Sequence, residues 1–574
     1  MGYMERYNEW LGYDFLDSDT KKQLLSMKGN DEKIKESFYG FVPFGTGGMR
    51  GIMGVGTNRM NIYTVRRATQ GFSDFIIANK QQKKGVAVIY DSRINSKKFA
   101  LEAALTFCAN GIKVYTFKSL RPTPFLSFVI RELGVAGGVN ITASHNAKDY
   151  NGYKLYLSDG AQFSFPDDEK IINYVNKIDD LSKCKTMSEK DAIKKGLLKY
   201  IDGAIDKKFK KCAEDKLINK AMVKKYGKEL KVVYTPLHGT GSVFLKDAFK
   251  EVGFTNVKIV KSQDDRNGEF KTVTYPNPES KAAFNEALKL ATQNDADIIV
   301  ATDPDADRLG VYVKTGNKNY MPLTGNELAS IIFEYILFFA KKNKVNFAKS
   351  YAVKSFVTTR MMEAICKRYN LELKVTLTGF KWIGKEILKS NKQFLFGCEE
   401  SYGFLVSDYV RDKDAISATL LTLELALAFK KYVGANLIDV LNMMRDYYGV
   451  YKNYNKNLDF VGVDGQEKMK SLMDSLRKNP ITQLTDIKVI RTDDYLTSKS
   501  HDMITQRDTT LPFPSNNTIV MNLEDNSVIT IRPSGTEPKI KIYFDILDKE
   551  EALADNKYEI LQQAVTKVFN AGGM

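Results

Sequence analysis

Strand-like and helix-like patterns alternate along most of this 574-residue chain, and this alternation limits the fold more than any other feature. The first round consists of a β-branched run at 85–90, a helical pattern at 99–109 and a short strand at 113–117. Similar rounds follow at 230–260 and at 349–377. Strands that alternate with helices predict layered α/β domains in which neighbouring strands are largely parallel.

The pattern changes after about residue 450. Closely spaced strands are predicted at 518–523, 528–532 and 540–544, and a helix at 553–569 closes the chain, which is typical of an α+β domain. The length itself favours about four domains. We therefore expect three α/β domains followed by a smaller α+β domain, at 1–205, 206–318, 319–450 and 451–574.

Composition and charge exclude several classes of protein. Apolar residues make up 43% of the chain and charged residues 27%, as in ordinary folded globular proteins. The net charge of +16 is spread over the whole chain, without a basic block interleaved with aromatic residues, so nucleic-acid binding is not expected. A positive field instead suits small anionic substrates.

The sequence also indicates a compartment. The N-terminus lacks an apolar segment of signal-peptide length, and the longest apolar runs, 328–340 and 418–429, are too short to cross a bilayer. The five cysteines lie far apart without a CxxC pair, which argues against a disulfide framework or a zinc site. We expect a cytoplasmic protein without membrane association; the sequence carries no signal of oligomeric state.

The segment ITASHN at 141–146 follows a predicted buried strand and contains Ser144 and His145. A serine among small and polar residues can carry a phosphoryl group as a phosphate ester. Ser144 is therefore a candidate nucleophile, although a polar loop after a strand has the same appearance.

Three aspartates, Asp303, Asp305 and Asp307, alternate directly after another predicted buried strand. On extended backbone alternate side chains point the same way, so the three carboxylates would converge. An EF-hand is excluded because its sixth and twelfth positions hold Arg308 and Lys314. Three carboxylates leave coordination positions open for a phosphate, which favours Mg²⁺ over a merely solvated acidic loop.

Polar residues in the third round are candidates for sugar binding. Glu399 and Ser401 lie in the loop GCEESYG, where a carboxylate and a hydroxyl can bind vicinal sugar hydroxyls. Thr378 and Gly379 form a nearby glycine loop, and Lys413 adds a cation close in sequence. A polar turn remains the alternative interpretation of the GCEESYG loop.

Two further segments are suited to anions. Arg532, Ser534, Gly535 and Thr536 lie in RPSGTEPK, which combines a guanidinium, hydroxyls and an approachable backbone in a phosphate cradle without Walker spacing. The glycine-rich stretch FGTGGMRG precedes a predicted helix and presents Arg50, but it lacks the GxGxxG spacing of a dinucleotide site.

Taken together and in this order, TASHN, DPDADR, GCEESYG and RPSGTEPK resemble the α-D-phosphohexomutase superfamily, in its longer phosphoglucomutase/phosphomannomutase form. The resemblance covers nearly the whole chain, with one motif in each expected domain. It implies four domains around a central cleft, of which three share a mixed-sheet α/β fold and the last is a smaller, mobile α+β domain.

The resemblance also implies a role for each matching residue. Ser144 would bear the phosphoryl group, and a phosphoserine oxygen would bind Mg²⁺ together with Asp303, Asp305 and Asp307. Arg50 and Lys154 match cations near the reacting phosphoryl group or the sugar. His145 matches the pattern as well, but side chains of adjacent residues on extended backbone point in opposite directions, so we expect His145 to support the site rather than to face the same way as Ser144. Residues implied to bind the phosphosugar are Thr378, Gly379, Glu399, Ser401, Lys413, Arg532, Ser534, Gly535 and Thr536.

The implied activity is the interconversion of glucose 1-phosphate and glucose 6-phosphate. The phosphoserine would give its phosphoryl group to the sugar and regain the other one from glucose 1,6-bisphosphate, which is both intermediate and activator. The loop reads EESYG where dual-specificity mannose/glucose enzymes look more like GEMSGH. The missing histidine favours glucose phosphates and leaves the general base unassigned.

Other activities stay open at this point. The same scaffold suits a phosphomannomutase, a phosphopentomutase or a sugar-bisphosphate synthase. A non-catalytic phosphosugar-binding protein is the alternative from another class, but such a protein has no need of a phosphorylatable serine beside a metal site. The absence of GxSxG disfavours a serine hydrolase.

Overall fold

The computed structural model describes the chain except residues 1, 46, 165, 461–464, 534–538 and 572–574. The described residues form two compact units. The first unit comprises 1–353 and 379–437, and the second comprises 354–378 and 438–574.

The first unit begins with three short helices and a mixed sheet. The helices are α1 (Tyr3–Leu11), α2 (Ser18–Ser26) and α3 (Asp31–Phe38). The strands are β1 (Phe44–Gly45), β2 (Gly48–Ile52), β3 (Val86–Tyr90), β4 (Val114–Thr116), β5 (Gly137–Ile141), β6 (Tyr150–Leu157) and β7 (Leu198–Tyr200). They lie in the order β1-β2-β6-β5-β3-β4-β7. Strands β5, β3, β4 and β7 are parallel, whereas β6 runs antiparallel to β5 and β2.

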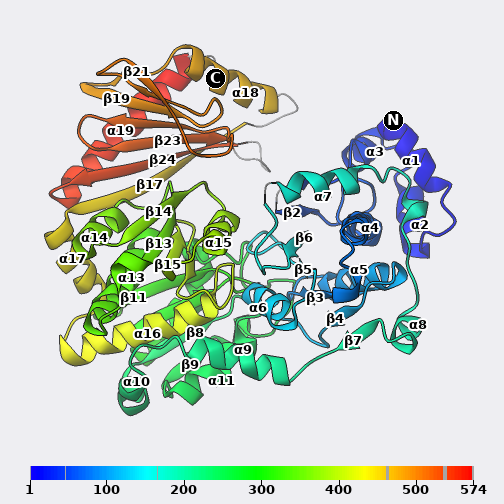
Figure 1. Cartoon of the computed structure of the whole chain (residues 1–574), viewed down its shortest axis with the longest axis horizontal. Coiled ribbons are helices and arrows are strands. Elements are labelled where there is room, and N and C mark those ends of the chain that lie inside the picture. Colours follow the sequence, from blue (N-terminus) through cyan, green and yellow to red (C-terminus); the bar gives the residue numbers. More distant parts are fainter. Residues whose placement is uncertain (1, 46, 165, 461–464, 534–538, 572–574) are drawn as a thin grey trace. The chain divides into compact units, whose positions relative to one another are not determined.

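Helices cover both faces of this sheet (Figure 1). A Cβ on Gly137 would contact Phe72 of α4 (Ile62–Ala78), whereas one on the next residue, Gly138, would contact Leu126 of α6 (Thr123–Leu133). Because successive side chains of a strand point to opposite faces, α4 and α6 lie on opposite sides of β5. Helix α5 (Ser96–Ala109) packs beside α4, and α7 (Asp167–Asn176), α8 (Glu189–Lys194) and α9 (Ala204–Glu214) follow.

A second mixed sheet in the same unit has the order β12-β11-β10-β8-β9. Its strands are β8 (Val232–Thr235), β9 (Val257–Ile259), β10 (Ile298–Thr302), β11 (Leu309–Gly316) and β12 (Asn319–Leu323). Strand β8 is parallel to β9 and β10, and β11 is antiparallel to β10. Helices α10 (Lys220–Tyr226), α11 (Ser242–Val252) and α12 (Asn285–Asn294) accompany it.

The remaining part of the first unit contains two long, largely buried helices, α13 (Gly325–Lys342) and α16 (Ala415–Tyr432), which match the predicted apolar runs. It also contains the shorter helix α15 (Phe380–Lys389). Strand β15 (Gln393–Glu399) forms an antiparallel pair with β16 (Gly403–Leu405). None of the helices in the described ranges combines the length and apolar character needed to cross a bilayer.

The second unit contains an antiparallel sheet of α+β type. Its main path is β17-β24-β23-β22-β19-β20-β21, with β18 beside β19. The strands are β17 (Val450–Asp459), β18 (Gln483–Leu484), β19 (Ile487–Asp494), β20 (Lys499–Asp502), β21 (Arg507–Thr510), β22 (Ile519–Leu523), β23 (Val528–Pro533) and β24 (Lys539–Asp548). Helices α18 (Gly465–Lys478) and α19 (Glu551–Ala571) pack on it over a core that includes Ile529, Ile542 and Leu561. The unit also holds α14 (Met361–Tyr369), β14 (Glu372–Thr376) and α17 (Leu437–Tyr448).

The predicted fold class is confirmed as α/β with an α+β C-terminal part. Most of the predicted elements lie within a few residues of their expected positions. The first two sheets are mixed, as the resemblance implies, whereas the alternation of strands and helices alone favoured largely parallel pairing. Strand β7 was not predicted. Strand β7 pairs with β4 through only three residues, too few for a periodicity to register. The division into four domains at 205, 318 and 450 stays a prediction.

Candidate active site

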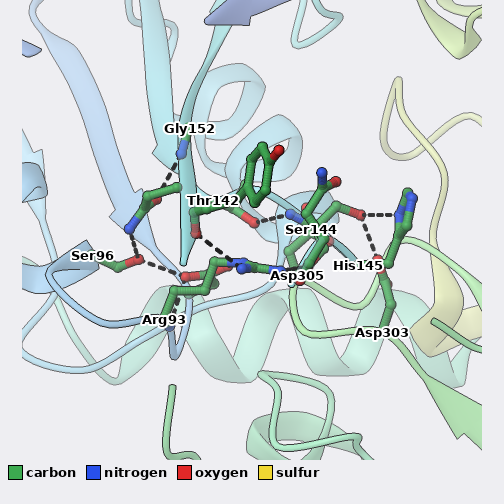
Figure 2. Close-up of polar contacts among 12 residues, drawn as sticks. Arg93, Ser96, Thr142, Ser144, His145, Gly152, Asp303 and Asp305 are labelled. Atoms are coloured by element: carbon green, nitrogen blue, oxygen red, sulfur yellow. Dashed lines mark hydrogen bonds and ion pairs between the residues drawn. The ribbon is translucent and has the colours of Figure 1, made fainter. Parts of the chain in front are cut away.

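Ser144 and Asp303 meet although they come from two different sheets of the first unit. Ser144 follows the end of β5, and Asp303 directly follows β10. The Ser144 hydroxyl donates to Oδ2 of Asp303 at 2.6 Å, and both residues are buried (Figure 2). Polar residues at the carboxyl ends of parallel strands are a recurrent place for active sites.

The loop around Ser144 is not extended, contrary to the expectation. Ser144 has a φ of 50°, in the left-handed region that non-glycine residues seldom adopt. Its N–H donates to Oγ1 of Thr142 at 2.8 Å. This bend brings Nδ1 of His145 to 3.3 Å from Oγ of Ser144, so the two adjacent side chains converge rather than diverge (Figure 2). Non-glycine residues in sparsely populated regions cluster at functional sites.

The three aspartates converge as predicted, but through a turn rather than through extended alternation. Ala306 has a φ of 50°, and its N–H donates to the carbonyl of Asp303 at 2.9 Å. One carboxylate oxygen from each aspartate lies within 4.8 Å of the others, and all three side chains are buried. The turn, which the Asp-Pro-Asp-Ala sequence accommodates, replaces the strand geometry that the spacing suggested.

The carboxylate cluster fits a divalent cation. Oδ1 of Asp305 and Oδ1 of Asp307 are buried, and neither has a hydrogen-bond partner among the described residues. A buried carboxylate oxygen without a partner is costly, whereas oxygen ligands of this kind are what Mg²⁺ prefers. The residues present therefore satisfy the donor set of a hard metal ion.

Two lysines balance the charge of the cluster. Nζ of Lys154, from β6, lies 2.7 Å from Oδ2 of Asp305 and 3.0 Å from Oδ2 of Asp307, and Nζ of Lys413 lies 3.3 Å from Oδ2 of Asp307. Burial alone would raise the pKa of Asp307, but the two ammonium groups outweigh it and lower that pKa. Burial and the neighbouring carboxylates of Asp305 and Asp307 raise the pKa of Asp303 well above its ordinary value. The negative charge thus concentrates on Asp305 and Asp307.

Lys413 itself is held by a pair of residues that the sequence analysis did not single out. Oδ1 of Asp412 lies 3.0 Å from Nζ of Lys413, and its Oδ2 accepts a hydrogen bond of 2.6 Å from the Tyr156 hydroxyl. Tyr156 is fully buried in β6, two residues beyond Lys154. Period-two spacing on a strand places Lys154 and Tyr156 on one face, which is a signal that the sequence offered.

Thr123 and Arg93 were also missed. The hydroxyl of Thr123 donates to Oδ2 of Asp305 at 2.6 Å and its N–H donates to the Asp305 carbonyl at 2.8 Å. Arg93 donates to backbone carbonyls of the Ser144 loop. Arg93 follows β3, so its place at the carboxyl end of a parallel strand was a usable signal; Thr123 at the start of α6 carried none.

The predicted sugar-binding residues of the first unit are brought together in part. Oε1 of Glu399, at the end of β15, accepts a hydrogen bond of 2.6 Å from the N–H of Gly379. Glu399 is buried, which raises its pKa, while Lys413 and the Gly379 N–H oppose this shift. Ser401 lies in the turn between β15 and β16 and is half-buried.

Arg50 and His145 complete the surroundings of Ser144. The Arg50 guanidinium, from β2, donates to Oδ1 of Asn146 at 2.8 Å. Burial, together with the guanidinium groups of Arg308 and Arg50, holds the pKa of His145 well below its usual range. His145 is therefore a neutral imidazole at pH 7, able to accept a proton from a hydroxyl.

The other predicted residues lie in the second unit or outside the described residues. Thr378 belongs to the segment 354–378 of the second unit, and Arg532 lies in β23 of that unit. Ser534, Gly535 and Thr536, which complete the predicted phosphate cradle, fall outside the residues that the structure describes.

Comparisons with known proteins place most of the chain in one family. Three family models match the chain: phosphoglucomutase/phosphomannomutase alpha/beta/alpha domain I at residues 42–182, domain II at 209–316 and domain III at 324–446. Ser144, the aspartate cluster and Glu399 each fall within a different one of these ranges.

The chain is also similar to known proteins over its whole length. A phosphoglucomutase of Staphylococcus saprophyticus is 33% identical over 576 residues, which cover 99% of each chain. Among solved structures, a putative phosphomannomutase from Thermus thermophilus has a TM-score of 0.68 at 21% identity, covering 92% of this chain and 99% of that one. Parafusin, a phosphoglucomutase from Paramecium, has a TM-score of 0.65 at 20% identity, covering 92% and 95%. These two likenesses show a shared fold. The family models and the full-length similarity establish that the chain belongs to the phosphoglucomutase/phosphomannomutase family of the α-D-phosphohexomutase superfamily.

Proposed function

We propose that this protein is an isomerase that interconverts glucose 1-phosphate and glucose 6-phosphate through phospho-Ser144 and glucose 1,6-bisphosphate. The observation that carries the proposal is the buried hydroxyl of Ser144, 2.6 Å from Asp303 within a three-carboxylate cluster. A serine in this setting is suited to hold a phosphoryl group between turnovers rather than to hydrolyse an ester. The full-length similarity to a phosphoglucomutase supports glucose as the sugar.

The chemistry is a pair of phosphoryl transfers. In the first, the bond between phosphorus and Oγ of Ser144 breaks while the O6 hydroxyl of glucose 1-phosphate bonds to phosphorus and gives up its proton. In the second, the turned sugar presents its O1 phosphate: Oγ of Ser144 bonds to that phosphorus and gives up its proton, the bond between phosphorus and O1 breaks, O1 takes up a proton, and glucose 6-phosphate leaves. Such transfers need in-line positioning and neutralisation of charge more than covalent help from the protein.

Asp303, Asp305 and Asp307 would hold Mg²⁺ together with an oxygen of the phosphorylated Ser144. The ion, when bound, supplies positive charge that stabilises the transferring phosphoryl group. Lys154 keeps Asp305 and Asp307 ionised and adjacent to the reacting group. Arg50 lies against the same loop and would contact the transferred phosphate.

His145 is a candidate for the general base that the sequence left unassigned. Its neutral ring lies 3.3 Å from Oγ of Ser144, where it can take the proton of the Ser144 hydroxyl when this oxygen attacks the sugar phosphate in the second transfer. A base must be unprotonated at the working pH, and the depressed pKa of His145 meets this condition. The contact of His145 with Ser144 depends on the left-handed backbone of Ser144.

The sugar and its second phosphate would bind to the remaining predicted residues. Glu399 and Ser401 would form hydrogen bonds with sugar hydroxyls, Thr378 and Gly379 would also bind the sugar, and Lys413 would bind the sugar or its phosphate. Arg532, with Ser534, Gly535 and Thr536, would bind the phosphate that is not being transferred. Mannose 1-phosphate is the second candidate substrate, because the family models cover both activities.

The protein is proposed to act in the cytoplasm on small phosphosugars, without nucleic acid or membrane partners. No disulfide joins cysteines among the described residues, and burial raises the pKa of Cys108 and Cys366 to about 12. Cysteines without disulfides are typical of proteins in a reducing compartment.

A substrate panel tests the proposal. Purified protein is assayed with glucose 1-phosphate, mannose 1-phosphate and ribose 1-phosphate, with Mg²⁺ and a catalytic amount of the matching sugar bisphosphate. We expect glucose to be fastest, Ser144→Ala to remove turnover by about 10⁴-fold or more, and intact-mass spectrometry to find one phosphate that the variant lacks. Normal turnover by folded Ser144→Ala would exclude the mechanism, and a faster mannose or pentose reaction would replace the assigned substrate.

A further inference from the structure

One arginine organises the backbone around Ser144. The two terminal nitrogens of Arg93 donate to the carbonyl of Ser144 at 2.5 Å, of Ala147 at 2.7 Å and of Tyr150 at 3.0 Å, and also to the carbonyl of Asn146. Arg93 is buried in the loop after β3, next to the Ser144 segment (Figure 2). Its Nε lies 3.4 Å from Oδ2 of Asp91.

These contacts explain how an unusual loop conformation persists. Ser144 has a left-handed backbone, and Asn146 and Ala147, whose carbonyls accept from Arg93, lie outside helices and strands. Buried carbonyls need donors, and a planar guanidinium can supply several at fixed angles from one side chain. Burial lowers the pKa of Arg93 to about 10, Asp91 opposes this shift, and the side chain stays cationic at neutral pH.

A loop from the second sheet of the same unit closes over Arg93. The ring of Phe270 lies 5.0 Å from Cζ of Arg93, within the range of a cation–π contact. A Cβ on Gly268 would lie 2.3 Å from the Ile94 nitrogen, so only glycine allows this approach of the two backbones. Glu269 forms an ion pair of 3.0 Å with Lys148 on the Ser144 side. We call residues 265–272 the brace loop.

His238 connects the two ends of the brace loop. Its ring is fully buried and joins Oδ1 of Asp265 at 2.6 Å and Oγ1 of Thr272 at 2.8 Å, the two ends of the brace loop. The same ring lies 6.0 Å from that of Phe270. His238 belongs to the HGTG segment after β8, which the proposed chemistry does not use.

We propose that Arg93 is a positioning residue that fixes the Ser144 loop for phosphoryl transfer, and that the brace loop, through Phe270, holds Arg93 in place. The structural part of this inference is independent of the reaction, and only its kinetic consequence rests on the proposed function. Arg93 touches no reacting atom, because all its contacts with the loop are to backbone carbonyls.

Arg93→Lys tests the first part against a matched control. Lysine keeps the charge but cannot span four carbonyls. Arg67→Lys is the control, since Arg67 is also buried, donates to one carbonyl (Ile178, 2.7 Å) and stacks on a ring (Phe41, 3.8 Å). Hydrogen exchange of the peptide 143–150 is measured in both variants. We expect at least tenfold faster exchange in Arg93→Lys and none of this change in Arg67→Lys.

Kinetics test the consequence for catalysis. In Arg93→Lys we expect kcat to fall about 100-fold, because a small displacement of a reacting group has effects of that size. The KM should change less than threefold, since the substrate-binding residues are untouched, and the rate at which glucose 1,6-bisphosphate phosphorylates Ser144 should fall in parallel with kcat. Arg67→Lys should keep both rates within threefold of the parent protein.

Phe270→Leu tests the role of the brace loop. It also tests whether the Ser144 loop depends on the position of Arg93 if Arg93→Lys does not fold. It should accelerate exchange at 143–150 and lower kcat about threefold to tenfold. A folded Arg93→Lys or Phe270→Leu variant with unchanged exchange in this peptide would overturn the corresponding part of the inference. If the parent protein converts no sugar phosphate, the proposed function fails, whereas the exchange measurement still decides the role of Arg93.

Discussion

The side chain of Lys413 occupies the space that a side chain at position 403 would need. A Cβ on Gly403 would lie 2.2 Å from Cδ of Lys413. On its other side, Nζ of Lys413 lies 5.3 Å from the centre of the Phe380 ring. The lysine is thereby directed to Asp307 and Asp412, at 3.3 Å and 3.0 Å. The position of a cation in the candidate site thus depends on the absence of a side chain on the neighbouring strand.

Gly403→Ala should impair the site without unfolding the protein. The lysine stem is flexible, so the methyl group displaces Lys413 from Asp307 rather than disrupting the core. We expect kcat/KM for glucose 1-phosphate to fall about tenfold to 100-fold. Gly316→Ala is the control, because a Cβ there meets nothing within 4 Å. Equal activity of both variants would show that Lys413 is not needed where the structure places it.

Tyr156→Phe removes the hydrogen bond to Asp412 that orients Lys413. The loss of one partner of a buried carboxylate should lower kcat/KM about threefold to 30-fold. Tyr153→Phe is the control on the same strand: its hydroxyl contacts Thr69 at 3.2 Å, away from the carboxylate cluster. Steady-state kinetics and thermal unfolding of both variants separate the two effects. Similar kinetics in the two variants would contradict a role for Tyr156 in the site.

Asp305→Asn should weaken metal binding. It replaces one carboxylate of the cluster by an amide whose nitrogen cannot act as a ligand. We expect the Kd for Mg²⁺, measured by isothermal titration calorimetry, to rise at least about tenfold. Asp297→Asn is the control, because Asp297 forms a surface ion pair with Lys430. An unchanged Kd in Asp305→Asn would mean that the ion binds elsewhere.

Glu214 makes stability depend on pH. Its side chain is 8% exposed, and burial with the nearby carboxylate of Glu251 raises its pKa to about 7 from an ordinary 4.5. Below pH 4.5 the carboxyl group is protonated in both the folded and the unfolded protein and does not change the free energy of unfolding. Above pH 7 it is ionised in both, and the buried charge destabilises the folded protein. The free energy of unfolding therefore falls as the pH rises from 4.5 to 7.

Glu214→Gln should consequently stabilise the protein above pH 7, by about 1–3 kcal/mol, and have almost no effect at pH 4.5. Thermal unfolding at pH 4.5 and pH 7.5 measures the difference. Glu286→Gln, which removes an i,i+3 pair with Lys289 on the surface, should show little effect at either pH. An equal shift of Tm for Glu214→Gln at both pH values would rule out the titration of this group as the cause.

Much of the fold was predictable because its signals are local. The buried strands β3, β8 and β10 and the helices α13 and α16 follow from short periodic or continuous apolar runs. Polar residues directly after such strands, Ser144 after β5 and Asp303 after β10, were found for the same reason. Very short strands such as β7 were missed, and the antiparallel pairs that make the sheets mixed were expected only from the resemblance, since pairing is decided by distant segments.

The geometry of the candidate site was only partly predictable. The convergence of Asp303, Asp305 and Asp307 was expected, but it arises from a turn with a left-handed Ala306. His145 approaches Ser144 because Ser144 is left-handed too. Neither residue is a glycine, so the sequence carries no mark of these conformations.

By itself the sequence determined the residue types, their order and the ends of the strands that present them, because these depend on neighbours along the chain. Only the tertiary structure decided that Ser144 reaches Asp303, that Arg93 organises the Ser144 loop and that Lys413 fits against Gly403. Those relationships join segments far apart in sequence. They are fixed by the packing of separate sheets and by the need of buried charges and carbonyls for partners, which no local pattern encodes.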